Sequence, residues 1–176
     1  GCTANEIGGG WRASGVGPTR LVRSTISDNQ AEGSGGAITT GADVPLSIIN
    51  RTITGNRARS VPGINDFAGT ISIVHSTLVD NVGIVPIDSD EQLVIDGSRG
   101  TFAPRLDNNI IVGPCELRGG DTSSVLSGQN NLLTDNTCSS VIGGNGGSGT
   151  PQPSGFRVNN ANTTRSALQL AELDAF

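Results

Sequence analysis

The acidic side chains that could bind a cation gather in one stretch, IDSDEQLVID (87–96). It carries four candidate contacts for Ca²⁺ or another ligand, namely Asp88, Asp90, Glu91 and Asp96. Carboxylate oxygens are the ligands that hard cations prefer. The stretch lacks the glycine and the terminal bidentate glutamate of a calcium loop, so a solvated surface loop is the favoured interpretation. No other cofactor is predicted.

The single histidine and the three cysteines offer little further chemistry. His75 occupies the same place in an internal repeat as the variable polar residues Arg23 and Asn50, which indicates an outward-facing position. No serine or cysteine partner for His75 is evident in the sequence, so an exposed surface residue without a catalytic role is favoured over a catalytic base. The cysteines lack paired C-x-x-C spacing and His75 is distant from them, so no zinc site is predicted.

The elements that must position these residues come from that repeat. The segments STISDN (24–29), RTITGN (51–56) and STLVDN (76–81) each place an apolar residue three positions before an asparagine. Ile26 lies 27 residues before Ile53, and Ile53 lies 25 residues before Leu78. Weaker copies at 109–114 and 131–136 continue the register through Ile111 and Leu133. Five copies in one register predict a repeat architecture.

The segments between turn residues predict strands, because they are short and rich in β-branched residues, as in LSIINRTIT (46–54) and TISIVHSTLV (70–79). In the second segment, alternation predicts one face for Ile71, Ile73 and His75. Glycine-rich turns and a period of 22–27 residues then predict an all-β fold, a parallel β-helix of about five to six coils.

The repeated asparagines predict a ladder inside the coil stack. Equivalent residues of successive coils lie about 4.8 Å apart, so each amide could donate to the carbonyl oxygen of the next. The predicted members are Asn29, Asn56, Asn81 and Asn136. The alternative is that these residues only form turns, since asparagine tolerates the left-handed backbone of a sharp corner.

A second corner is predicted where paired glycines recur. The segments GGGW (8–11) and GGAI (35–38) keep the step of 27 residues, which also aligns Trp11 with Ile38. The predicted turn glycines are Gly9, Gly10, Gly35 and Gly36. A side chain at such a corner would clash with the neighbouring backbone.

These motifs resemble those of a known group of proteins. GGAI (35–38) followed by ITGN (53–56) resembles the paired tetrapeptides of polymorphic outer-membrane proteins and related bacterial β-helix surface proteins. The segment 108–138 is similar to the closing coils of large secreted repeat proteins with cell-surface anchor signals, through Cys115, then Gly128, Asn130 and Leu132, then Cys138. The resemblance covers about 8–138 and implies a right-handed, secreted or surface-exposed β-helix, commonly a stalk or adhesin passenger. The chain departs from the pattern where Ile or Leu replaces Phe and in the irregular coil 84–107.

The cysteine spacing predicts one disulfide. Cys115 and Cys138 are 23 residues apart, close to the local coil step of 22, so adjacent coils would bring their Cα atoms within the disulfide range of roughly 4.4–6.8 Å. A bridge would indicate an oxidising compartment, and two buried free thiols are the alternative. Cys2 has no assigned partner.

Composition excludes several classes of protein. The net charge is −5 and the charges are scattered, whereas nucleic-acid binders present a basic face. No apolar run approaches the roughly 18 residues of a membrane helix. Four arginines could line one side and contact an anionic glycan, although scattered solubilising charge is the favoured explanation for Arg23, Arg51, Arg57 and Arg59. The opening GCTANEIGGGW suggests a mature form or an excised fragment.

The predicted domains are the β-helix over 1–142, a Gly/Pro-rich loop or linker over 143–155, and a C-terminal strand and short helix over 156–176. Ser166 could cap that helix, which carries Leu168, Leu170 and Leu173. It could cover the open end of the β-helix, where unpaired strand edges invite aggregation, or dock against another copy of the chain. Truncation is the alternative explanation of the abrupt ending.

The favoured function is a non-enzymatic, secreted or cell-surface scaffold, stalk or adhesin-like segment whose lateral face binds a glycan or a surface protein. One alternative is a polysaccharide lyase or hydrolase, or a fragment of one, because many parallel β-helices degrade polysaccharides. Polygalacturonase-type hydrolysis needs paired carboxylates, and the motifs Asn-Thr-Asp, Asp-Asp, Gly-His-Gly and Arg-Ile-Lys are absent, so no catalytic residue is assigned. The second alternative is a filament subunit that associates end to end.

Overall fold

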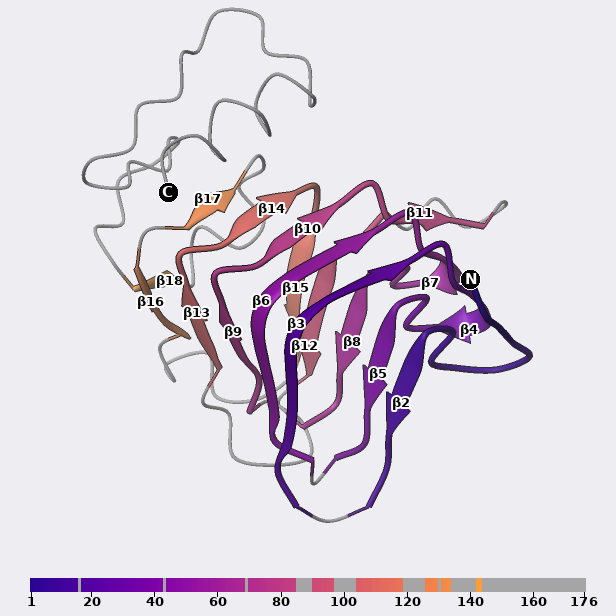
Figure 1. The fold of residues 1–176 in the computed structure, drawn as a ribbon, viewed down its shortest axis with the longest axis horizontal. Helices are drawn as coiled ribbons and strands as arrows, with labels where there is room; N and C mark the ends of the chain where they lie inside the picture. The colour runs from indigo at the N-terminus through magenta and orange to yellow at the C-terminus, as the bar shows by residue number, and fades with distance from the viewer. Residues whose placement is uncertain are drawn as a thin grey trace, which may run out of the picture.

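The computed structural model of the chain describes residues 1–15, 17–42, 44–68, 70–84, 90–96, 104–118, 126–129, 131–133 and 142–143. Within these ranges the secondary structure is entirely β, and every strand pairing is parallel. Successive coils lie side by side and wind into a β-solenoid (Figure 1). The predicted fold class, a parallel β-helix, is confirmed.

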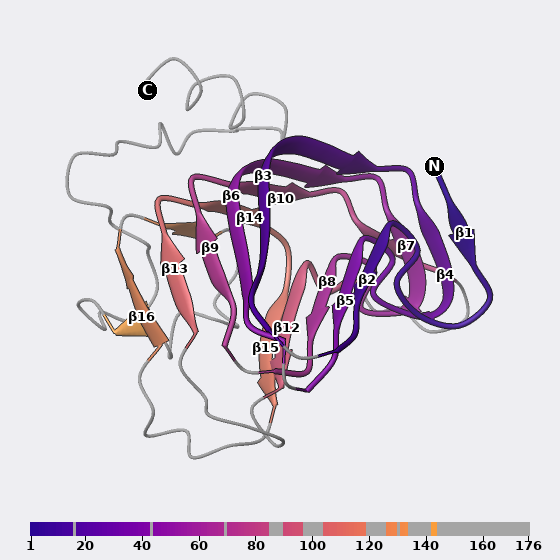
Figure 2. The same ribbon diagram turned by 60° about the horizontal axis from the view of Figure 1, so that its bottom comes forward.

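Three sheets form the walls of the solenoid (Figure 2). The four-stranded sheet contains β1 (Thr3–Ala4), β4 (Gln30–Ser34), β7 (Arg57–Ser60) and β11 (Val82–Gly83). The five-stranded sheet contains β2 (Trp11–Ala13), β5 (Ile38–Thr40), β8 (Ile64–Asp66), β12 (Leu93–Asp96) and β15 (Cys115–Arg118). The nine-stranded sheet contains β3 (Thr19–Ser27), β6 (Leu46–Thr54), β9 (Ser72–Val74), β10 (Thr77–Val79), β13 (Arg105–Asp107), β14 (Ile110–Val112), β16 (Leu126–Gln129), β17 (Leu132–Leu133) and β18 (Ile142–Gly143).

The register of the repeat is the one that the sequence predicts. In the nine-stranded sheet, Ile26 pairs with Ile53, Ile53 with Leu78, Leu78 with Ile111, and Ile111 with Leu133. In the five-stranded sheet, Trp11 pairs with Ile38, and Ile38 pairs with Ile64. The irregular spacings of the later coils are therefore absorbed in the loops, while the paired residues stay aligned.

A bend divides each coil's passage through the nine-stranded sheet. The four residues at the bend have positive φ angles of 50–54°, namely Arg23, Asn50, His75 and Asn108. In the first coils β3 and β6 run through the bend, and in later coils two shorter strands replace them, such as β9 and β10. The outward-facing position predicted for His75 from the repeat is confirmed, whereas the alternation that groups His75 with Ile71 and Ile73 breaks at this residue. Its left-handed backbone interrupts the alternation, so Ile71 and Ile73 are buried and His75 is exposed.

The core is a stack of aliphatic side chains from the nine- and five-stranded sheets. Its fully buried members include Ile38, Ile48, Ile53, Ile64, Ile73, Leu78, Leu93, Leu106 and Ile111. Trp11 is partly buried and packs against this cluster in the first coil, where the next two coils place Ile38 and Ile64. Burial of branched side chains on every coil supplies the main driving force for stacking.

The cross-section changes along the stack. The chain passes from β14 to β15 through Gly113 and Pro114 alone, so this coil has no strand in the four-stranded sheet. The three-walled cross-section is therefore complete over slightly fewer coils than the predicted five to six. Residues 144–176 lie outside the described residues, so the predicted linker, strand and helix of that segment stay predictions.

Candidate functional site

The acidic candidates serve as structural contacts where the structure describes them. Asp90 is exposed, and its Oδ1 accepts the backbone N–H of Gly83 at 3.0 Å. Glu91 Oε1 lies 3.7 Å from Arg118 Nη2. Asp96 is half-buried and pairs in register with Arg118 on the neighbouring strand, and Asp88 lies outside the described residues. Within the described residues, no group of three or more His, Cys, Asp and Glu side chains could hold a metal ion.

Arg118 gathers the acids at the edge of the five-stranded sheet. Its Nη2 donates to Glu116 Oε2 at 2.6 Å, on the same exposed strand face. That hydrogen bond, with the nearby charge of Glu116, Glu91 and Asp96, raises the pKa of Arg118 above its ordinary value. Arg118 and Glu116 are both more than two-fifths exposed, so this is a solvated ion-pair cluster of modest strength.

The predicted asparagines form a buried hydrogen-bonded chain between coils. Asn29 Nδ2 donates to Asn56 Oδ1 at 2.9 Å, and Asn56 Nδ2 donates to Asn81 Oδ1 at 2.8 Å. Each of these Oδ1 atoms also accepts the backbone N–H of the asparagine in the preceding coil, at 3.1 Å in both cases. The column begins at the backbone N–H of Cys2, which donates to Asn29 Oδ1 at 2.8 Å. These coils are thus joined to one another through side-chain amides as well as through strand pairing.

Gln92 ends this column, which the sequence did not predict. Its Oε1 accepts the Nδ2 of Asn81 at 2.7 Å, and its Nε2 donates back to the backbone carbonyl of Asn81 at 2.9 Å. Pro114 lies three residues after Ile111, as Asn81 lies three residues after Leu78, so proline takes the ladder position in the next coil. A proline offers no side-chain amide and no N–H. Gln92 fills that gap, and Asn136, the fourth predicted member, lies outside the described residues.

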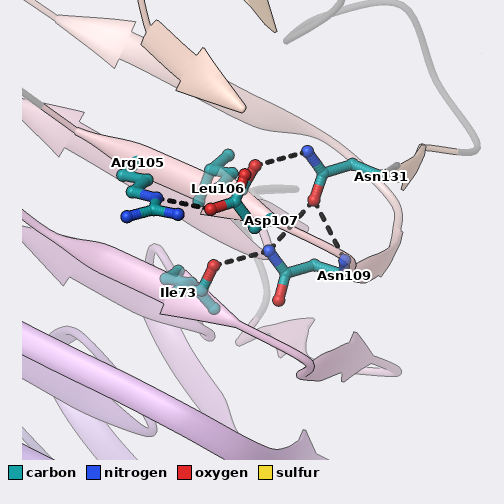
Figure 3. A network of polar contacts seen from close by, with 6 residues as sticks. All are labelled: Ile73, Arg105, Leu106, Asp107, Asn109 and Asn131. Atoms are coloured by element: carbon teal, nitrogen blue, oxygen red, sulfur yellow. Dashed lines mark hydrogen bonds and ion pairs between the residues drawn. The ribbon is translucent and has the colours of Figure 1, made fainter. Parts of the chain in front are cut away.

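We call Asn29, Asn56, Asn81 and Gln92 the first polar column. A second polar column, Ser76, Asn109 and Asn131, follows the bend of the nine-stranded sheet. Figure 3 shows its Asn109 and Asn131. Asn109 Oδ1 accepts the N–H of Ser76 at 2.9 Å, and Asn131 Oδ1 accepts both the N–H and the Nδ2 of Asn109 at 3.0 Å. The amides also donate to the carbonyls of Ile73 and Leu106, each at 2.7 Å. Beside this column Arg105 pairs with Asp107.

A residue with a left-handed backbone stands directly before five members of these columns, namely Asn29, Asn56, Asn81, Ser76 and Asn109. Asp28, Gly55 and Asp80 have φ angles of 58°, 67° and 54° and stand directly before Asn29, Asn56 and Asn81. His75 and Asn108 stand in the same relation to Ser76 and Asn109, with φ angles of 51° and 54°. A positive φ turns the chain sharply. His75 therefore shapes a corner, and it lies exposed outside the second polar column.

The glycine corner connects the four- and five-stranded sheets. Gly9 donates its N–H to Gly35 O at 3.0 Å, and Gly10 donates to Gly36 O at 3.1 Å. A Cβ at Gly36 would lie 2.5 Å from the carbonyl oxygens of Arg57 and Pro62, and one at Gly9 would lie 2.5 Å from Gly36 O. Gly35 also has a φ of +68°. The backbones of neighbouring coils lie so close together at this corner that they occupy the space a side chain would need.

Arg51 differs from Arg23 and Arg57 in its burial. Arg23 and Arg57 are exposed, whereas Arg51 is only 9% exposed and lies in register with Ser76. Its Nε has no hydrogen-bond partner among the described residues. Burial lowers the pKa of Arg51. The idea of four arginines along one side is therefore wrong at Arg51, because the side chain that follows the bend turns inward.

The cysteines differ in environment. Cys2 is exposed and free, and Cys115 is 2% exposed and packs with the aliphatic core. Cys138 lies outside the described residues, so the predicted bridge stays a prediction.

Within the described residues, no helix has the length and apolar character needed to cross a membrane.

Comparison with known proteins found no matching family model, no matching curated protein and no matching solved structure. The resemblance to bacterial β-helix surface proteins therefore rests on the sequence motifs alone.

Proposed function

We propose that the protein is a non-enzymatic scaffold, a rigid stalk or adhesin-like segment that presents a lateral face. The observation that carries this proposal is the use of buried polar side chains. In the first polar column Asn56 makes contacts to the coils on both sides, and no atom of its amide is left for a ligand. Buried hydrogen-bonded networks of this kind favour one rigid arrangement.

The side chains that could do chemistry support the same conclusion. Asp90 caps a backbone N–H, and Glu91 lies beside Arg118. His75 shapes an exposed bend. Each of these residues has a structural task that accounts for its position.

The face proposed for binding is the outer side of the nine-stranded sheet in the first coils. Ile26 and Ile53 point to the core, so their neighbours point outward, and these are the hydroxyl residues Thr25, Ser27, Thr52 and Thr54. In-register strands place the hydroxyls in two rows at the strand spacing of about 4.8 Å. A glycan or a surface protein with matching polar groups is the proposed ligand class.

We also propose an extracellular location and a Cys115–Cys138 disulfide. The register supports the pairing, since Ile111 pairs with Leu133 and the same step of 22 carries Cys115 to position 137, next to Cys138. Peptide mapping under non-reducing conditions tests it, with Cys2→Ser as the variant that removes the exposed thiol. A linked peptide containing both residues supports the bridge, and full alkylation of both thiols in the native protein contradicts it.

An assay of polysaccharide depolymerisation separates the scaffold from an enzyme. The folded chain is incubated with acidic and neutral polysaccharides, with and without Ca²⁺, and released oligosaccharides are measured. The scaffold proposal predicts no products, together with retention of the chain on the polysaccharide or surface protein that it binds. Cleavage that disappears in the Asp88→Ala, Asp90→Ala double variant, but survives Glu116→Ala, would make the 84–107 coil part of an active site and overturn the proposal.

A further inference from the structure

The outer face of the nine-stranded sheet changes its chemistry along the stack. After the bend, the outward positions of the first two coils carry threonine and serine. In the third coil Thr77 keeps one of these columns polar. Val79 in the other column and the residues of the next coils are aliphatic, and we call Val79, Ile110, Val112 and Leu132 the lateral apolar patch. They point outward because the residues that alternate with them, Leu78, Ile111 and Leu133, belong to the core.

Most of the lateral apolar patch is nevertheless buried. Val79, Val112 and Leu132 are 2%, 3% and 5% exposed and form a cluster of their own, separate from the core, with Ile110 packed against it. Val74, which points outward before the bend of the same sheet, is only half-buried. An outward position in this sheet therefore does not by itself bury an aliphatic side chain, which points to a covering element over the patch.

We propose that residues 156–176 of this chain cover the lateral apolar patch. β18 is the last described strand and pairs with β16 in the nine-stranded sheet, so the chain leaves the solenoid from the sheet that carries the patch. The 12 residues 144–155 that follow can span up to about 40 Å, enough to cross the sheet. Segment 156–176 then supplies apolar side chains of matching chemistry, including Leu168, Leu170 and Leu173.

This docking site is on the side wall of the solenoid and not over its open end. It is also independent of the proposed function, since a scaffold and an enzyme would both need the patch covered. Covering it keeps a contiguous apolar surface out of water, where it would promote association. It also leaves the hydroxyl face of the first coils open.

Thiol labelling of a reporter cysteine tests the proposal in the full chain. Val79→Cys reports on the patch and Val74→Cys is the matched control, both in a Cys2→Ser background. We expect maleimide to label position 79 at least about tenfold more slowly than position 74, since the label reacts only after local opening. Replacing Leu168, Leu170 and Leu173 by serine should raise the rate at position 79 by at least about tenfold and leave position 74 unchanged. The polar control variant Gln169→Ala, Glu172→Ala should change neither rate.

The proposal would be overturned by equal labelling rates at the two positions in the full chain, or by protection of position 79 that survives the triple serine variant. It would also be overturned by protection that grows with protein concentration, because that result would identify a second copy of the chain as the cover. If the triple variant raises both rates through general unfolding, a cross-link decides. A chain carrying Val79→Cys and Leu170→Cys should form an intrachain disulfide on mild oxidation, whereas Val74→Cys with Leu170→Cys should not. Failure of the first pair to form it refutes the docking.

Discussion

Removing the amide of Asn56 is the sharpest perturbation of the first polar column. Asn56 is fully buried, and its Oδ1 accepts two hydrogen bonds, from the N–H and the Nδ2 of Asn29. In Asn56→Ala both donors of Asn29 lose their acceptor, and Asn29 is itself buried, with only 7% of it exposed. The carbonyl of Thr54 keeps the N–H of Asp28 as a partner, so the loss falls mainly on Asn29.

The magnitude follows from the number of orphaned donors. A buried donor without a partner costs about 1–3 kcal/mol, so two of them give about 4 kcal/mol of lost unfolding free energy. This is a large fraction of the roughly 5–15 kcal/mol that stabilises a typical domain. With a urea m-value of about 2 kcal/mol/M, the unfolding midpoint should fall by about 2 M.

Urea unfolding followed by circular dichroism measures the effect. Thr52→Ala is the matched control, because Thr52 lies on the same strand, points outward and is exposed, so its loss should change stability by less than about 0.5 kcal/mol. Asn56→Asp should be at least as destabilising as Asn56→Ala at neutral pH. It keeps an acceptor for Asn29 but places an oxygen against Asn81 Oδ1, Ile26 O and Thr54 O. A loss below about 1 kcal/mol in Asn56→Ala would show that the two donors of Asn29 do not depend on the Asn56 amide.

Three further predictions concern the corners and the buried arginine. Gly36→Ala should destabilise the protein by about 1–3 kcal/mol in urea unfolding, because its Cβ would meet two backbone oxygens at 2.5 Å. Gly41→Ala is the control and should be tolerated, because the nearest neighbour of its Cβ would be at 3.5 Å. Equal losses of stability in the two variants would contradict this prediction. His75→Gly should leave stability unchanged or raise it, while His75→Val should lower it by about 1–2 kcal/mol, because only glycine accepts a φ of +51° without strain. Thermal unfolding measures both variants, and a glycine variant less stable than the valine variant would disprove the role of the bend. Arg51→Met should be neutral or stabilising by about 1 kcal/mol, because it removes a buried guanidinium whose Nε lacks a hydrogen bond. Arg57→Met is the control at an exposed arginine. A loss of unfolding free energy above about 2 kcal/mol in Arg51→Met would show that Arg51 has a required partner.

The repeat could be predicted from the sequence because its signal lies in one residue type at one spacing. Ile26, Ile53 and Leu78 are each followed three residues later by an asparagine, and burial on one face fixes that register. The alternation failed at His75 because a left-handed residue resets it, and no β-strand pattern announces such a residue when it is a histidine or an arginine.

The second polar column was missed because its members differ in type. Ser76 and Asn109 occupy equivalent positions, and a serine conceals the repeat. A usable signal was present in the pairs Asn108–Asn109 and Asn130–Asn131, which are separated by the same 22 residues as Ile111 and Leu133. Gln92 could not be found by spacing at all, because it reaches the first polar column from another part of the coil, 11 residues after Asn81.

Hydrogen exchange in the native state tests whether the polar columns join the coils into one rigid unit. The backbone amides of Asn29, Asn56 and Asn109 donate to side-chain oxygens of the next coil and are not ordinary strand pairs. If the columns hold the coils together, these three amides exchange only through global unfolding, with the same opening free energy as the core amides of β6. Exchange through local openings, with an opening free energy several kcal/mol below that of β6, would show that the columns do not hold the coils together.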